Sequence, residues 1–135
     1  NPVKSDFQAI AKVIHDTGYT PAKNQEYQQR LRQAKSEAEV KATLGEMTQY
    51  IEKVPAGLNA LSLKTDEGRS IRDDLSQGID KFVRGTKQAI AAPDKDSQAQ
   101  EAASQLAMEG LQQFVQGLNR FMVAAEREGI KLENK

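Results

Sequence analysis

Residues 107–125 read AMEGLQQFVQGLNRFMVAA, and the spacing of the apolar side chains in this stretch decides the fold class. These side chains recur at alternating intervals of four and three residues, which is the spacing of one face of an α-helix that packs at a small angle against another. The seam consists of Ala107, Leu111, Phe114, Leu118, Phe121 and Ala125. The pattern predicts a long helix with a partner helix along its length.

Other parts of the chain show the same helical periodicity. Three further segments are expected to be helical: about 6–16, 21–54 and 66–90. The apolar stripe changes phase at 35–39, so this region is either one overwound helix or two helices that meet. Pro55 disfavours the α conformation in the residue before it, and we expect this segment to end at Val54. Residues 55–65 are expected to be an apolar, partly helical connection.

Residues that favour helix ends flank several of these segments. Ser5 and Gln8 have the spacing of a capping box and predict the start of the first helix. Gly18 and Gly129 are placed to end the first and last helices. The helices are therefore expected to be separate elements joined by short turns.

The composition agrees with a folded helical protein. The 19 basic and 19 acidic residues cancel, so no net charge holds the chain open, and no segment alternates as a strand would. We predict an all-α fold, an elongated antiparallel helical bundle with four main helices plus a short N-terminal helix. A single domain is expected to span residues 1–135.

Each of the last two predicted helices carries two glycines seven residues apart, although glycine inside a helix costs about 1 kcal/mol relative to alanine. Seven residues are close to two helical turns, so each pair lies on one face. The pattern favours close packing of two helices, and the alternatives are a ligand-sized cleft or a groove for a partner helix. The candidate groove or partner face consists of Gly78, Phe82, Gly85, Gly110, Phe114, Gly117 and Phe121.

Residue types that carry out catalysis or bind metals are scarce. The chain has one histidine, His15, and no cysteine, which argues against a histidine- or cysteine-ligated zinc site and a cysteine nucleophile. The acidic residues form no calcium-loop pattern and are expected to make exposed ion pairs. We predict a protein that is not an enzyme, with no metal, no cofactor and no nucleic-acid partner.

Two stretches are similar to a known family. Residues 34–41, AKSEAEVK, with Leu44 and Met47 behind them, resemble the start of the second helix of the soluble b-type cytochromes of the bacterial periplasm. Residues 98–106, QAQEAASQL, resemble the last helix of that family. The resemblance implies an exported four-helix bundle with up-down-up-down topology. Phe114 stands where the family carries its axial histidine, so no haem is expected.

The beginning of the chain suggests where the protein works. The sequence starts at Asn1 without a methionine, and no apolar run is long enough for a membrane-spanning helix. We interpret the chain as part of an exported protein, periplasmic or outer-membrane-associated, in which a lipid just before Asn1 would be the only membrane link. A cytoplasmic location is the alternative.

The predicted function is that of a binding or scaffold module for a protein partner. One alternative is a carrier of a small apolar ligand in a cleft between helices. The other is a structural protein that forms homo-oligomers through its last helix, because the seam of residues 107–125 is long and uninterrupted.

Overall fold

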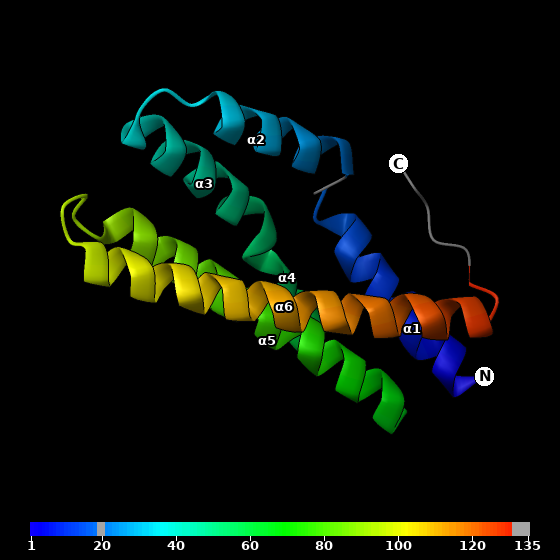
Figure 1. The fold of residues 1–135 in the computed structure, drawn as a ribbon. Coiled ribbons are helices and arrows are strands. Elements are labelled where there is room, and N and C mark those ends of the chain that lie inside the picture. The colour runs from blue at the N-terminus through cyan, green and yellow to red at the C-terminus, as the bar shows by residue number, and fades with distance from the viewer. Residues whose placement is uncertain (19–20, 131–135) are drawn as a thin grey trace.

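The computed structural model describes residues 1–18 and 21–130, and for Pro21 only the backbone. All regular secondary structure in these residues is helical, which confirms the predicted all-α fold class. Six helices follow one another along the chain (Figure 1): α1 (Pro2–Asp16), α2 (Pro21–Gln33), α3 (Glu37–Ile51), α4 (Lys53–Asn59), α5 (Asp66–Ala91) and α6 (Ser97–Arg127).

The two longest helices, α5 and α6, form an antiparallel hairpin. Thr65 caps α5 because its hydroxyl oxygen accepts a hydrogen bond from the Gly68 N–H at 3.0 Å. Asp96 caps α6 in the same way, with a carboxylate oxygen 3.0 Å from the Ala99 nitrogen. The hairpin is the element on which the other helices are assembled.

Glycines bring the backbones of α5 and α6 into contact. A Cβ atom built on Gly78 would lie 2.8 Å from the carbonyl oxygen of Gly110, and one built on Gly85 would lie 2.8 Å from that of Ala103. Both separations are shorter than real Cβ atoms show, so only glycine fits between the two backbones. The close helix packing that the glycine pairs favoured is therefore present.

The remaining helices attach to one side of this hairpin. α3 packs along α5, and α2 packs on α3; within the described residues α2 has no close backbone contact with α5 or α6. Among the side chains of α2 that the structure describes, Tyr27 alone is buried, and it lies against Tyr50 of α3 with 6.2 Å between ring centroids. Because the rest of α2 is largely polar, it has one face to bury, and the bundle is an open row of α2, α3, α5 and α6 (Figure 1).

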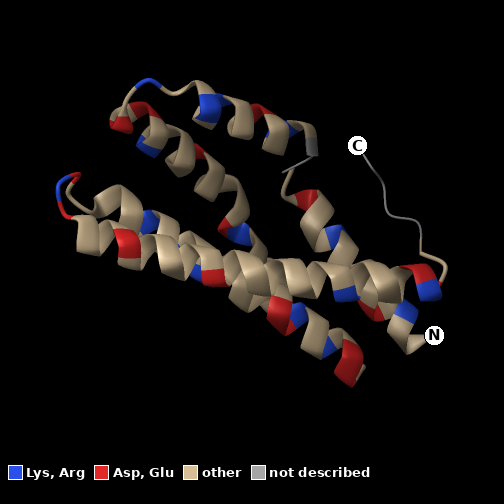
Figure 2. Cartoon of the chain, in the orientation of Figure 1, with Lys and Arg blue, Asp and Glu red and all other residues tan. Residues whose placement is uncertain are grey.

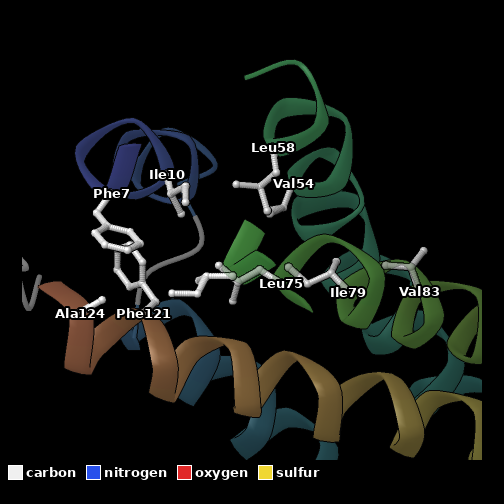
Figure 3. Packing of buried hydrophobic residues seen from close by; sticks show 10 residues of the cluster. Phe7, Ile10, Val54, Leu58, Leu75, Ile79, Val83, Phe121 and Ala124 are labelled. Carbon is white, nitrogen blue, oxygen red and sulfur yellow. The ribbon is translucent and has the colours of Figure 1, made fainter. Parts of the chain in front are cut away.

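The main core lies where α1 and α4 meet the hairpin (Figure 3). Phe7 of α1 and Phe121 of α6 pack edge to face, with ring centroids 5.9 Å apart and an interplanar angle of 83°. The buried cluster consists of Phe7, Ile10, Val54, Leu58, Ile71, Leu75, Ile79, Val83, Phe121 and Ala124. This cluster joins segments from both ends of the chain.

The structure corrects the predicted start of the first helix. α1 begins at Pro2, because the Asn1 side chain accepts a hydrogen bond from the Val3 N–H at 3.0 Å and proline suits the first helical position. Ser5 and Gln8 therefore lie inside the helix and do not form its cap. The predicted stops are confirmed, since Gly18 and Gly129 have φ angles of +76° and +71°.

The structure also shows which of the alternatives for residues 21–65 is present. Two helices, α2 and α3, meet at residues 34–36, where the chain would otherwise have needed an overwound helix. The predicted end at Val54 is wrong, because Val54 and Pro55 lie in the first turn of α4. Proline is tolerated there because the first N–H groups of a helix have no intrahelical partner. The partly helical connection is confirmed as α4.

Asp6 ties α1 to the beginning of α5. Its buried carboxylate accepts hydrogen bonds from the Lys64 N–H at 2.9 Å, the Thr65 N–H at 2.8 Å and the Thr65 hydroxyl at 2.6 Å. Burial raises the pKa of Asp6, but these hydrogen bonds together with nearby Arg69 outweigh it, and the pKa lies below the usual value. The carboxylate therefore holds the two helices together in its charged form.

Replacing Gly78→Ala should lower the free energy of unfolding by about 1–3 kcal/mol, because the added methyl group forces α5 and α6 apart. Gly45→Ala in α3 is the matched control, since nothing lies within 4 Å of its Cβ position; it should stabilise the protein by up to about 1 kcal/mol. Urea unfolding followed by circular dichroism measures both. Equal stability of the Gly78→Ala and wild-type proteins would contradict the backbone contact.

Replacing Asp6→Asn should cost about 1.5–3 kcal/mol at neutral pH, because the hydrogen bonds to a charged acceptor are lost. Folding lowers the pKa of Asp6. Its contribution to the free energy of unfolding is therefore complete above the unfolded-state pKa of about 3.9, and it is lost as the pH falls through the lower folded-state pKa. The stability gap between wild type and variant should therefore narrow below about pH 4.

The control for this experiment is Asp73→Asn, whose half-exposed carboxylate pairs with Arg72 at 2.7 Å and should contribute less than about 1 kcal/mol. Urea unfolding at a series of pH values gives both gaps. A gap for Asp6→Asn that does not change with pH would show that the carboxylate charge is not what holds α1 to α5.

Candidate functional site

Large apolar side chains are exposed along one side of α6. The exposed fractions are 57% for Met108, 47% for Leu111, 44% for Val115, 49% for Met122 and 67% for Val123. Four of these residues, with half-buried Leu118 between them, follow the alternating three and four spacing of a helix face. We refer to Met108, Leu111, Val115, Leu118 and Met122 as the outer stripe.

The outer stripe exists because α6 is apolar over more of its circumference than its neighbours cover. Four small residues spaced seven apart are buried on the side that faces α5: Ala103, Gly110, Gly117 and Ala124. α1 covers part of the next side through Phe121. Figure 2 shows few charged residues along α6. The apolar side chains that neither α5 nor α1 covers are exposed to solvent.

The predicted seam of the last helix is divided by the structure. Phe121 and Ala125 are buried, Phe114 and Leu118 are half-buried against the core, and Leu111 is exposed. The residues that sequence reasoning missed are Met108, Val115 and Met122. The signal was present, because these three residues recur at intervals of seven, each one residue after a position of the predicted seam.

The seven residues of the candidate groove or partner face lie at or beside the contact between α5 and α6. Phe121 is buried in the core, and Phe82 and Phe114 are half-buried. The four glycines are buried: Gly78, Gly85, Gly110 and Gly117. The facing helix occupies the space that a cleft would have offered at these glycines, so the favoured interpretation of close packing is present there and the alternative of an open groove is not.

Two surface hollows are present elsewhere. One of about 330 Å³ lies between α2 and α3 and includes Arg30, which pairs with Glu46. The other, of about 370 Å³, lies beside α4 and α5 and includes Arg84, which pairs with Asp80 at 2.9 Å. Most of the lining residues are polar, and Arg30, Arg84 and Ser76 are already engaged in ion pairs or hydrogen bonds.

The chemically active residue types are placed in structural roles. His15 is exposed, with its Nδ1 atom 3.6 Å from a carboxylate oxygen of Asp16. Asp6 is the buried charged side chain in the described part of the chain, and it is held by the hydrogen bonds to Lys64 and Thr65. Within the same residues, no three histidine, aspartate or glutamate side chains converge as a metal site would require.

Ion pairs follow the edge of the hairpin. Arg120 of α6 pairs with Asp74 of α5 at 2.8 Å, and Arg127 pairs with Glu67. The hydrogen bond from Arg127 lowers the pKa of Glu67, so this pair is charged near neutral pH. These pairs draw Arg120 and Arg127 toward α5, and the side chains of the outer stripe itself carry no charge.

The described helices were also compared with the needs of a membrane span and with known proteins. None of the helices in residues 1–18 and 21–130 combines the length and the hydropathy of a membrane span. No curated protein and no solved structure matches the chain. Of the resemblance to the periplasmic b-type cytochromes, only the helical bundle is supported.

A protein-family model does match, and it covers most of the chain. The model is described as uncharacterised lipoprotein PM1805, and the match extends over residues 4–125. This range includes the α5–α6 hairpin and the whole outer stripe. The chain therefore belongs to the PM1805 family of lipoproteins.

Proposed function

We propose that this chain is the exported, lipid-anchored part of a protein-binding module, and that it recognises its partner through the outer stripe of α6. The module acts by binding and not by catalysis, and it uses no metal or cofactor. The observation that carries this proposal is the exposed apolar face formed by Met108, Leu111, Val115 and Met122.

The size and chemistry of the outer stripe support a protein partner. The exposed parts of its side chains amount to a few hundred Å², in the range of the largest apolar patch of a typical monomer, which is often functional. A row of apolar side chains at helical spacing is the kind of surface that packs against another amphipathic helix. The polar hollows at Arg30 and Arg84 give less support to the alternative of a small apolar ligand.

The lipoprotein family supports attachment to a membrane, and we place the lipid before Asn1 and the module in the periplasm. The Asn1 side chain donates a hydrogen bond to Glu128 at 2.8 Å, so the N-terminus lies beside the end of α6 (Figure 1). From Met122 to Met108 the outer stripe runs about 21 Å away from this end. A lipid at the N-terminus would therefore leave the stripe accessible above the membrane.

The product of the complete gene should incorporate a labelled fatty acid and sediment with membranes. The 135 residues contain no cysteine, so an acylated cysteine would have to lie outside them. Replacing that cysteine with serine should abolish the label and release the protein into the soluble fraction. Recovery of the unmodified, unlabelled protein in the soluble fraction would contradict the anchor.

A photo-crosslinking amino acid at Val115 should yield a specific protein adduct in living cells, because this residue lies in the middle of the outer stripe. The matched control carries the same probe at Gln116, which is exposed but points to the polar side of α6. Adducts are separated by electrophoresis and identified by mass spectrometry. Equal labelling at both positions, or no adduct at either, would contradict binding through the outer stripe.

A further inference from the structure

We propose that the outer stripe binds the outer stripe of a second copy of this chain, with the two α6 helices antiparallel. Read from either end, the apolar side chains follow the same order: Met108, Leu111, Val115, Leu118 and Met122. A two-fold dimer needs a surface that is complementary to itself, since each patch meets the same patch of its partner. This order meets that requirement with Val115 on the two-fold axis.

The spacing of the stripe agrees with antiparallel pairing. Met108 and Met122 each lie seven residues from Val115, so a methionine of one copy meets the other methionine of its partner. Leu111 and Leu118 lie four and three residues from Val115 and meet in the layers between. A parallel pair would also bury apolar groups, but it would place the like ends of the two helix dipoles side by side.

The charged residues of α6 leave the outer stripe open to a second copy. Between Glu101 and Glu126 the helix has two charged residues, Glu109 and Arg120. Arg120 contacts Asp74 and therefore faces α5, and Glu109 lies about 100° around the helix from Met108. Neither belongs to the outer stripe, so self-pairing brings no like charges together in the centre of the stripe. Glu101 and Glu126 lie beyond its two ends.

The apolar area of the outer stripe indicates how tightly two copies would bind. The outer stripe offers a few hundred Å² on each copy, so the two copies together bury less than the roughly 1,200 Å² of the smallest stable interfaces. The dimer should therefore be weak in solution, with a dissociation constant in the micromolar range or above. This step rests on the proposed function, because it names the partner of the same outer stripe.

The absence of cysteine in the 135 residues allows a sharp test. In a Val115→Cys variant of the full chain, two cysteines on the two-fold axis would lie close enough for a disulfide. Oxidation at micromolar concentration should link this variant at least about tenfold faster than the control Gln116→Cys, because the pair holds the thiols at a raised effective concentration. Circular dichroism verifies that both variants are folded.

The orientation is tested with Met108→Cys and Met122→Cys. Each variant alone should crosslink as slowly as the control, whereas an equal mixture should form the mixed disulfide rapidly. Rapid linkage of Met108→Cys to itself would overturn antiparallel pairing. Sedimentation equilibrium of the unmodified chain should show a monomer–dimer equilibrium, and a Val115→Arg variant should weaken it at least about tenfold, since a charge would be buried at the axis.

A chain that stays monomeric up to near-millimolar concentration, with Val115→Cys no faster than its control, would overturn self-pairing. The photo-crosslinked adduct at Val115 separates this failure from that of the proposed function. An adduct with an unrelated protein would overturn self-pairing and leave the binding module standing. An adduct with the mass of two chains would support both.

Discussion

The backbone contact between α5 and α6 is the constraint on which the rest of the structure depends. Gly78 and Gly110 face each other so closely that neither could carry a side chain without moving a helix. Interior glycines weaken isolated helices, so α5 and α6 obtain much of their stability from each other. Because this contact uses only one narrow side of each helix, the other sides remain free for α1, α3 and α4, and for a partner.

The free sides of α5 and α6 are covered to different extents by the other helices. α5 is covered on its free sides by α3, α4 and α1, and its large apolar residues enter the core beside Phe7 and Leu58. α6 has neighbours only in α5 and α1 among the described residues, so its second row of apolar side chains stays in solvent. The open row of helices thus produces the exposed outer stripe, and a closed bundle with α2 against α6 would have buried it.

The helices of this arrangement could be predicted from the sequence, whereas the outer stripe could not. The period of the seam and the glycine pairs predicted two long helices in close contact, because both signals are local to the helices that show them. The position of the exposed face could not be predicted, because Met108, Val115 and Met122 have the same spacing as the buried positions. Which of two equivalent stripes faces solvent depends on where α1 and α3 pack, and this is decided by contacts between segments far apart in the chain.

By itself, the sequence determined the helical class, the ends at Gly18 and Gly129, and the need for a facing backbone at the glycine pairs, since each follows from residue type and short-range spacing. Only the tertiary structure decided that, among the described helices, α2 packs on α3 alone and that α6 keeps an uncovered apolar side. The physical reason is that burial is a property of the assembled helices. A side chain at helical spacing is suited to a partner, but the arrangement of its neighbours decides whether that partner belongs to the same chain.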